Sequence, residues 1–391
     1  MKKANIAYCI PSLYIAGGME RVLTQKANFL DQKGYEIHII VTDGRGKKPY
    51  FHLNSSVKLH NLDINFDDLY GCFMPIRIFR YQLKMKKLKK RLNACLCSIK
   101  PDIAVSLLRR DINVINDMND GSIKMGEIHL DRLHYRTFRV SFLPSFVNAY
   151  IERRWMSSLV YQLRQLSRFV VLTHEDAAFW KEIDNVSVIP NPVAFFPELV
   201  SDCTQKQVIA VGRLFEQKGF DRLISAWAKV VEKHPEWNLK IYGDGELREE
   251  LQRQIKDLQL SDSCILEHSV QNIVSKYCES SIFVLSSRFE GFGLVIVEAM
   301  ACGVPAISFA CHCGPRDIIA DRINGLLVPE GDIDKLATKI CYLIEHEEER
   351  KLMGRMARQR AFDYRIENVG QQWIELFETL LREKEQLLES L

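Results

Sequence analysis

Short apolar runs alternate with longer segments of helical periodicity along most of the chain. Residues 5–10 (NIAYCI) form the first run, a helical segment extends from about Met19 to Lys33, and residues 36–43 (EIHIIVTD) form the second run. Neighbouring parallel strands need a crossover connection, which a helix provides. We therefore predict a βαβ unit here, and the runs PDIAVSLL and SRFVVLT continue the pattern toward residue 173.

A proline-marked segment, residues 188–198 (VIPNPVAFFPE), separates this pattern from a second one. The strand-like runs QVIAVGRL, NLKIYGDG, CILEH, SIFVLSS and PAISFA then alternate with helical segments such as 221–234 and 246–258. A helical tail starts near Ile333. Such alternation is typical of parallel sheets that helices cover on both faces.

We therefore predict an α/β chain of two doubly wound, Rossmann-like domains that face each other across a cleft. The N-terminal domain is expected to comprise residues 1–192 and the C-terminal domain residues 193–369, with a last helix at about 370–391 packed back on the first domain. Ligands of open parallel sheets lie beyond the carboxyl ends of the strands, so the site is expected in the cleft. The alternative is two independent domains on a flexible linker.

The composition is that of a globular protein. Hydrophobic residues make up 47% of the 391 residues and charged residues 26%, and the formal net charge is only +3. The eleven cysteines are an odd number scattered along the chain, which favours reduced thiols over a disulfide framework. No apolar window is long enough to span a membrane, and the first apolar run is too short for a signal peptide, so we expect a cytoplasmic protein.

Two strand-end loops carry groups that suit a phosphate. Gly17 and Gly18 precede a predicted helix whose unpaired N–H groups and dipole favour an anion. The G-x-G-x-x-G fingerprint of dinucleotide sites is absent there. Arg213 and Lys218 follow the first strand of the second pattern. An arginine can bind a phosphate through two parallel hydrogen bonds, and a lysine adds a point charge.

Three other motifs have simpler explanations than a ligand site. Asp244, between two glycines, is expected to cap the helix that follows it. The sequence DIDK, residues 332–335, has the D-x-D form of some metal sites, but its place at a helix start favours N-capping. The cysteine pairs 95/97 and 311/313 are too closely spaced for a typical zinc site. We therefore expect no metal site.

Two carboxylates stand eight residues apart in an otherwise apolar segment, SSRFEGFGLVIVEAMACGVPAI, residues 286–307. They belong to Glu290, in a turn after a buried strand, and Glu298, on the helix that follows. If the interval were wholly helical, it would measure about 12 Å, the length scale of a sugar joined to a ribose by a diphosphate. Three backbone N–H groups would then face the diphosphate, those of Phe292, Gly293 and Leu294.

This arrangement resembles the retaining glycosyltransferases of the GT-B fold, family four. The motifs that carry the resemblance are, in order, GGMER, VIPNP, VGRL with QKGF, YGDGE, EGFG with EAMACGVP, and NGLLVP. The run FACHCGPRDII is similar to a subgroup that builds bacterial surface polysaccharides. The resemblance covers nearly the whole chain.

The resemblance implies a role for each candidate residue. Glu290 would bind hydroxyls of the donor sugar and Glu298 those of the nucleotide ribose, while Arg213 and Lys218 would neutralise the diphosphate leaving group. A histidine of the first domain lies near the reacting sugar in this family; His129 is the expected counterpart and the rival is His134. The other expected contacts to the nucleotide sugar are Gly17, Gly18, Val270, Phe292, Gly293 and Leu294.

The family also implies a reaction. It transfers a sugar from a nucleotide-diphosphate donor, here expected to be a UDP-sugar, to a lipid-linked or polysaccharide acceptor in the biosynthesis of surface polysaccharide or lipopolysaccharide. Retention is attributed to a front-face route in which the leaving phosphate takes the acceptor proton, and no metal or other cofactor is expected. The alternatives are a sugar-nucleotide epimerase or phosphorylase on the same fold, and a non-catalytic protein that binds nucleotide sugars.

One segment of the first domain is strongly basic. Residues 76–92 (IRIFRYQLKMKKLKKRL) carry eight cations, and no acid occurs between Asp68 and Asp102. Apolar residues recur in it near helical spacing, namely Ile76, Phe79, Leu83, Leu88 and Leu92. A basic amphipathic helix can lie on anionic lipid, at about 1 kcal/mol per basic residue. We expect peripheral attachment to the inner face of the cell membrane through the helix around Arg77–Arg91; the alternative is a solvated helix packed on the sheet. No aromatic platform for nucleic acid accompanies the charge.

Overall fold

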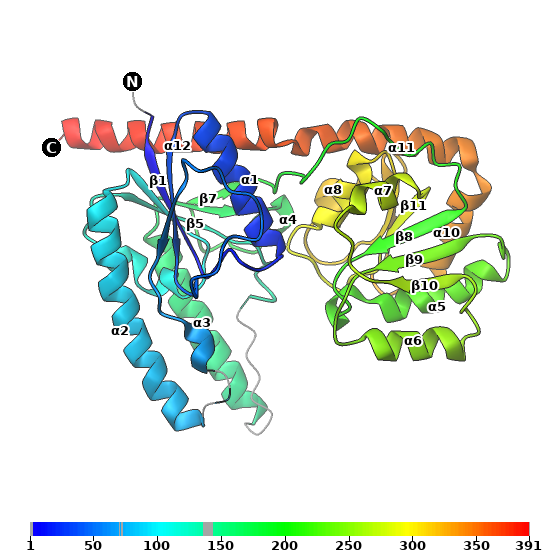
Figure 1. Cartoon of the computed structure of the whole chain (residues 1–391), viewed down its shortest axis with the longest axis horizontal. Coiled ribbons are helices and arrows are strands. Elements are labelled where there is room, and N and C mark those ends of the chain that lie inside the picture. Colours follow the sequence, from blue (N-terminus) through cyan, green and yellow to red (C-terminus); the bar gives the residue numbers. More distant parts are fainter. Residues whose placement is uncertain (1–2, 70, 72, 136–143, 391) are drawn as a thin grey trace. The chain divides into compact units, whose positions relative to one another are not determined.

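The computed structural model describes residues 3–69, 71, 73–135 and 144–390. The chain divides into two compact units. The first comprises Met1–Leu172, Asp176–Pro192 and Ile366–Leu391, and the second comprises Thr173–Glu175 and Val193–Arg365. Each unit contains one parallel sheet with helices on its faces (Figure 1). The predicted α/β class with two doubly wound domains is therefore confirmed.

The sheet of the first unit has the strand order β3-β2-β1-β4-β5-β6-β7, and every neighbouring pair is parallel. Its strands are β1 (Asn5–Ile10), β2 (Glu36–Val41), β3 (Lys58–Asn61), β4 (Ile103–Ser106), β5 (Ile123–Glu127), β6 (Arg168–Val171) and β7 (Val186–Val188). The order reverses between β1 and β4, which makes their carboxyl ends the switch point where ligands of such sheets bind.

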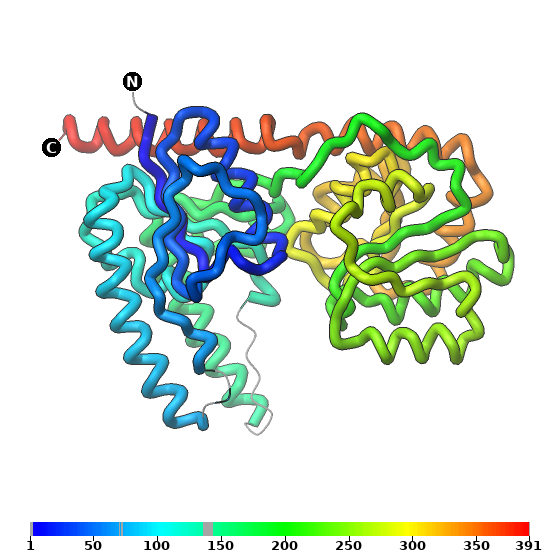
Figure 2. Tube along the Cα trace, in the orientation of Figure 1, coloured from blue at the N-terminus to red at the C-terminus, as the bar shows by residue number. Residues whose placement is uncertain are grey.

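Different helices cover the two faces of this sheet. α1 (Gly18–Gln32) and α12 (Ile366–Glu389) share one hydrophobic cluster with the sheet, whereas α2 (Met74–Ile99) and α3 (Ser145–Arg164) share another. α1 and α12 are in contact, so the last helix of the chain packs beside the first (Figure 2). The short helices are η1 (Phe66–Leu69), η2 (Asp111–Asn113), η3 (Ile115–Asp117) and α4 (His174–Ala177).

The sheet of the second unit has the order β10-β9-β8-β11-β12-β13. Its strands are β8 (Gln207–Val211), β9 (Asn238–Tyr242), β10 (Cys264–Glu267), β11 (Ile282–Leu285), β12 (Ala306–Phe309) and β13 (Gly325–Val328). β8 and β11 are parallel neighbours, with Val208 opposite Ile282. The order reverses between them, so the loops after β8 and β11 form the switch point of this sheet.

Seven helices and two 3-10 turns among the described residues surround the second sheet. They are η4 (Glu216–Lys218), α5 (Phe220–Val231), α6 (Arg248–Asp257), α7 (Ile273–Cys278), α8 (Leu294–Ala301), α9 (Pro315–Ile318), α10 (Ile333–Glu345), α11 (Glu347–Ala361) and η5 (Phe362–Tyr364). The predicted helical tail is thus divided into α10, α11 and α12. In the described part of the chain, no helix is both long enough and apolar enough to cross a bilayer.

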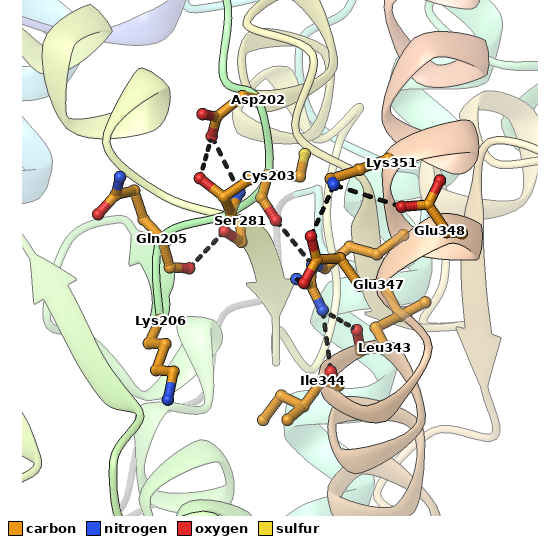
Figure 3. Close-up of polar contacts among 12 residues, drawn as sticks. Asp202, Cys203, Gln205, Lys206, Ser281, Leu343, Ile344, Glu347, Glu348 and Lys351 are labelled. Carbon is orange, nitrogen blue, oxygen red and sulfur yellow. Dashed lines mark hydrogen bonds and ion pairs between the residues drawn. The ribbon is translucent and has the colours of Figure 1, made fainter.

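A buried arginine fastens α10 and α11 to the segment that leads into β8. Arg350 donates hydrogen bonds to the carbonyl oxygens of Cys203 (3.0 Å), Leu343 (2.5 Å) and Ile344 (3.0 Å). Figure 3 shows these carbonyl groups gathered beside α11, next to the exposed pair of Glu347 with Lys351. An arginine buried in this way satisfies three carbonyl groups that would otherwise lack donors.

Candidate active site

An ion pair joins the loops that follow β8 and β11. Lys218 Nζ lies 2.7 Å from Glu290 Oε1, and the same oxygen accepts a hydrogen bond from Ser287 Oγ at 2.6 Å. The side chains of Lys218 and Glu290 are 19% and 7% exposed. Two residues that lie 72 positions apart are therefore brought together at the switch point of the sheet. Sequence reasoning paired these two but did not identify Ser287.

Backbone contacts hold the two loops in register. Arg288 N donates to Gln217 O at 2.8 Å, and Ser286 Oγ donates to Lys218 O at 2.9 Å. In the other direction, Gln217 Nε2 donates to Phe289 O at 3.0 Å. Because these bonds fix the main chain on both sides, the Lys218 ammonium and the Glu290 carboxylate are positioned by a rigid support.

Two further residues lock the turn that carries Lys218. Gly219 has φ +61°, and a Cβ atom at this position would lie 2.2 Å from Ser286 O. The guanidinium of Arg288 donates to both carboxylate oxygens of Asp221, at 2.9 and 2.8 Å, and to Glu216 O at 2.7 Å. Burial raises the pKa of Asp221, but the two hydrogen bonds from Arg288, its charge and the backbone hydrogen bonds together lower this pKa on balance. Only the glycine in the QKGF motif could have signalled this tight approach.

The helix after β11 begins after the turn that carries Glu290, as the sequence predicted. Gly293, with φ +92°, is the N-cap of α8, whose first residue is Leu294. Glu290 therefore precedes the helix, so the interval between the two carboxylates is not wholly helical and the helical length of about 12 Å does not apply to it. Among the described residues, the backbone N–H groups at this end that have no protein acceptor include those of Phe292, Gly293 and Leu294. They make the start of α8 suitable for an anion.

Glu298 is buried on α8, at 4% exposure. Its Oε2 accepts a hydrogen bond of 3.2 Å from the hydroxyl of Tyr277, a fully buried residue at the end of α7. A buried carboxylate needs donors, and Tyr277 supplies one of them. The sequence predicted the need but did not identify this donor.

Arg213 and Val270 are both exposed near the carboxyl end of the sheet. Arg213 lies two residues after β8, and Val270, at 40% exposure, follows β10. The loop after β9 approaches the Arg213 loop closely, since a Cβ atom at Gly243 would lie 1.9 Å from Gly212 O. The structure thus places the expected nucleotide contacts of this unit on the loops after β8, β10 and β11.

The two capping predictions had opposite outcomes. Asp332 is the N-cap of α10, and its Oδ1 accepts from Lys335 N at 3.0 Å, as predicted. Asp244 does not cap α6, so that prediction was wrong. Its carboxylate instead accepts from Ser269 N at 3.0 Å and contacts His268 Nδ1 at 2.6 Å, because the intervening loop turns it toward the end of β10. The contacts with Ser269 and His268 lower the pKa of Asp244.

The glycine loop of the first unit already holds a carboxylate. Gly17 is buried and caps α1, while Gly18 is exposed. A Cβ atom at Gly17 would lie 2.0 Å from Glu20 Oε2, so the Glu20 side chain folds back over the loop. An acidic residue in the first turn is favourable at a helix N-terminus. Any ligand phosphate in this loop would lie near that carboxylate.

Both candidate histidines of the first unit have acidic neighbours. His129 follows β5, and its Nε2 lies 3.3 Å from Glu127 Oε1. His134 Nδ1 lies 2.7 Å from Asp131 Oδ2. The side chain of His129 is 8% exposed and that of His134 is 33% exposed. The buried position next to the end of a central strand favours His129 as the positioned histidine, and its catalytic role stays a prediction.

One carboxyl group near the first switch point was not anticipated. Asp111 begins η2, a few residues beyond β4, and is 2% exposed. Burial raises its pKa to about 6, although hydrogen bonding to Ser106 opposes the shift. Among the described residues, its Oδ2 has no hydrogen-bond partner. A single aspartate in a loop gives no sequence signal for this burial.

Comparisons with known proteins match these features. Residues 194–360, which include Arg213, Lys218, Glu290 and Glu298, match the family of glycosyl transferases group 1. An uncharacterized glycosyltransferase of Haemophilus influenzae is 28% identical over 95% of this chain and 99% of its own. A Campylobacter jejuni alpha-1,4-N-acetyl-D-galactosaminyltransferase, named for a PP-undecaprenol-linked substrate, is 27% identical over 95% of this chain and 98% of its own.

The solved structures agree at the level of the fold. A variant of S. aureus TarM in complex with Fondaparinux, alpha-GlcNAc-glycerol and UDP superposes with a TM-score of 0.78. The match covers 96% of this chain and all of that chain, at 16% sequence identity. The fold on which these residues are arranged is therefore that of the GT-B proteins.

Proposed function

Since this chain is a glycosyltransferase whose residues 194–360 belong to the glycosyl transferases group 1 family, we propose that it transfers a sugar from a UDP-sugar to a lipid-linked or polysaccharide acceptor with retention of configuration. Its relatives include bacterial enzymes of surface-glycan synthesis. The observation that carries the proposal is the Lys218–Glu290 pair at the switch point, beside the unpaired N–H groups of α8.

The donor is bound by groups of opposite sign on the second unit. Lys218, Arg213 and the N–H groups at the start of α8 neutralise the diphosphate. Glu290 accepts hydrogen bonds from the sugar hydroxyls and Glu298 from those of the ribose. UDP is the preferred nucleotide because a protein of the same fold forms a complex with it.

The reaction exchanges one bond at the anomeric carbon. The bond from this carbon to the β-phosphate oxygen breaks, and the acceptor oxygen forms its bond on the same face of the sugar. The acceptor proton passes to the departing phosphate oxygen, so UDP leaves and no enzymatic nucleophile is needed. Preorganised cations and N–H groups stabilise the charge that develops on the diphosphate. Under this proposal Lys218 and Arg213 replace a divalent metal.

The part of α2 that we propose to contact the membrane is smaller than the sequence suggested. Leu88 and Leu92 are buried against the sheet, so α2 cannot lie flat on a bilayer along its whole length. Several expected cations are also used within the unit: Lys84 donates to the carbonyl oxygens of Ile64 and Asn65, and Arg91 donates to that of Leu62. The part of α2 from Lys84 onward therefore has a structural role.

The first turns of α2 and α3 are the better membrane surface. Figure 1 shows that the N-terminal parts of both helices extend past the ends of the strands of the first sheet. Large apolar side chains are exposed on them, namely Phe73, Met74, Ile76, Ile78, Phe79, Leu83, Phe146 and Tyr150. Exposed apolar patches with neighbouring cations fit an anionic bilayer. We propose that this surface, the helical tip, brings the enzyme to a lipid-linked acceptor.

The proposed activity is tested by supplying nucleotide sugars with and without glycan or lipid-linked acceptors and measuring released nucleotide and product anomer. UDP release that requires the acceptor, with an α-linked product from an α-linked donor, supports the proposal. Release of UDP or an isomerised sugar without acceptor indicates an epimerase. Donor binding without turnover for any acceptor indicates a binding protein, and an inverted product contradicts retention.

A further inference from the structure

A fully buried ion pair lies beside the candidate histidine of the first unit. Lys26, from the middle of α1, pairs with Glu127, the last residue of β5, and each side chain is only 1% exposed. Charged groups removed from water in this way are costly unless they are well paired. Apolar residues of the same size could provide the same stability. The pair therefore requires a further explanation.

Aromatic rings enclose the lysine on its other sides. Its Nζ lies 3.8 Å from the ring centroid of Trp373, on α12, and 5.0 Å from that of Tyr8, on β1. Such cation–π contacts partly replace the lost hydration of an ammonium group. Burial lowers the pKa of Lys26, and the neighbouring Glu127 opposes this shift. The lysine is thereby fixed between α1, β1, β5 and α12.

The two oxygens of Glu127 face different partners. Oε2 pairs with Lys26, and Oε1 lies 3.3 Å from His129 Nε2. Burial alone would raise the pKa of Glu127, but Lys26 and His129 hold it at about 2. The charged and titratable groups that face Glu127 are thus Lys26 and His129, with the Tyr8 hydroxyl nearby, whose own pKa is raised by burial and by Glu127.

We propose that Glu127 is the positioning residue that orients His129 and favours its charged form. In this proposal, Lys26 partly neutralises the negative charge of Glu127 and so limits its effect on the histidine. The proposal rests on the proposed function and on the expectation, from the family resemblance, that His129 lies near the reacting sugar. Lys26 is carried by the helix that begins at Gly18, so the same pair also ties the glycine loop to the histidine. A carboxylate at this distance favours the charged imidazole, although His129 Nε2 makes no hydrogen bond within the described residues.

Opposite substitutions test the electrostatic part of the proposal. In Glu127→Gln, loss of the negative charge should shift the titration of His129 to lower pH, because an opposite charge at this distance favours the charged imidazole. In Lys26→Met, Glu127 loses its partner, so its full negative charge should shift the titration of His129 to higher pH. The readouts are the His129 ring signal in an NMR titration, assigned with His129→Gln, and the pH profile of kcat/KM.

A second variant protects the test against unfolding. The double substitution Lys26→Met/Glu127→Gln removes both charges, so no unpaired charge stays buried. The titration of His129 in this variant should match that in Glu127→Gln. The matched control is Lys124→Met/Asp120→Asn, which removes another ion pair of the same strand and should leave the His129 titration unchanged. Shifts of opposite sign in the two single variants support the proposal.

The remaining outcomes separate the two proposals. Unshifted His129 titration in both single variants, with activity falling only as the melting temperature falls, assigns the pair a structural role and overturns this inference. Full transfer activity in His129→Gln overturns the role of the histidine. Absence of transfer in the wild-type enzyme with every donor overturns the proposed function, while the NMR titration still tests the contact between Glu127 and His129.

Discussion

Lys218 Nζ and Glu290 Oε1 are 2.7 Å apart at the switch point of the second sheet. In the proposed mechanism the lysine binds the diphosphate and the glutamate binds the sugar. These are adjacent groups of one donor molecule. Two residues with those roles must lie within a few ångströms of each other, and they do. The same contact also has a simpler reading as a structural ion pair, and the first prediction separates the two.

Lys218→Ala should lower kcat/KM by roughly 10- to 100-fold, because a charge-assisted hydrogen bond contributes about 1.5–3 kcal/mol. Glu290→Gln should lower it as well, and combining the two should not restore activity. Steady-state kinetics with the donor varied measure the effect. The matched control is Lys229→Met, which removes a lysine from an exposed ion pair of the same unit and should be silent.

A structural pair would behave differently. If both single substitutions lowered the melting temperature while kcat/KM changed no more than in Lys229→Met, Lys218 and Glu290 would not contact the substrate. Recovery of activity in the charge-swapped double variant would point the same way.

Glu298→Ala should mainly raise the KM for the donor, because the carboxylate is proposed to bind the ribose in ground state and transition state alike. Tyr277→Phe should have a smaller effect in the same direction, since it removes one donor from Glu298. Calorimetric titration with UDP measures both. Unchanged affinity for UDP in Glu298→Ala would reject the ribose assignment.

Gly219→Ala should displace the Lys218 turn, because the added Cβ would meet Ser286 O at 2.2 Å and φ is +61°. We expect kcat to fall several-fold and stability to fall by about 1–3 kcal/mol. Gly46→Ala is the control: its φ is +67°, but no atom lies within 4 Å of the added Cβ. Equal effects of the two substitutions would show that only backbone strain matters at Gly219.

Asp111 should make stability depend on pH. Its folded-state pKa, about 6, lies above the unfolded value of 3.8, so the folded state binds the extra proton and the free energy of unfolding falls as pH rises from 4 to 6. The loss is at most about 3 kcal/mol, at 1.36 kcal/mol per pKa unit. Asp111→Asn has no ionisable group at this position and so lacks this loss. From pH 4 to 6, the free energy of unfolding of the wild-type protein should therefore fall relative to that of Asp111→Asn.

Urea unfolding at pH 4, 5, 6 and 7, followed by tryptophan fluorescence, measures this difference, and other titrating groups cancel in it. A difference that stays constant from pH 4 to 7 would mean that Asp111 is ionised normally in the folded protein.

Ile76→Ser/Phe79→Ser should weaken binding to vesicles of phosphatidylglycerol and phosphatidylcholine, because both side chains are exposed on the helical tip. Binding by the wild-type protein should decrease with salt and be weak on phosphatidylcholine alone. Leu133→Ser, another exposed apolar residue of the first unit, is the control. Sedimentation that is insensitive to salt, or equal for both variants, would exclude the tip as the membrane surface.

Much of the fold could be predicted because buried parallel strands are continuous apolar runs. Asn5–Ile10 and Ile282–Leu285 are both of this kind and were identified. The edge strand Lys58–Asn61 was missed, since its polar residues are mostly exposed and give no such run. Helical periodicity likewise could not tell which turns of α2 cover the sheet, so Leu88 and Phe79 were assigned to one face although only Leu88 is buried.

The candidate site was predictable to the level of its loops. A change of strand order brings the loops after β8 and β11 together. The family resemblance had assigned Lys218 and Glu290, on these two loops, to one donor molecule. The supporting contacts came from elements that the motifs do not include, as with Tyr277 on α7 and Asp221 beside Arg288. Such contacts depend on tertiary packing, which no local pattern records.

The central claim is that Arg213, Lys218, Glu290 and Glu298 bind one nucleoside-diphosphate sugar. Calorimetric titration of UDP-sugars into the wild-type protein and into Arg213→Ala/Lys218→Ala tests it most directly. We predict binding by the wild-type protein, without added metal and in the presence of EDTA, and a loss of affinity of at least about 100-fold in the double variant. Equal affinity in the two proteins, or binding that requires a divalent metal, would contradict the account.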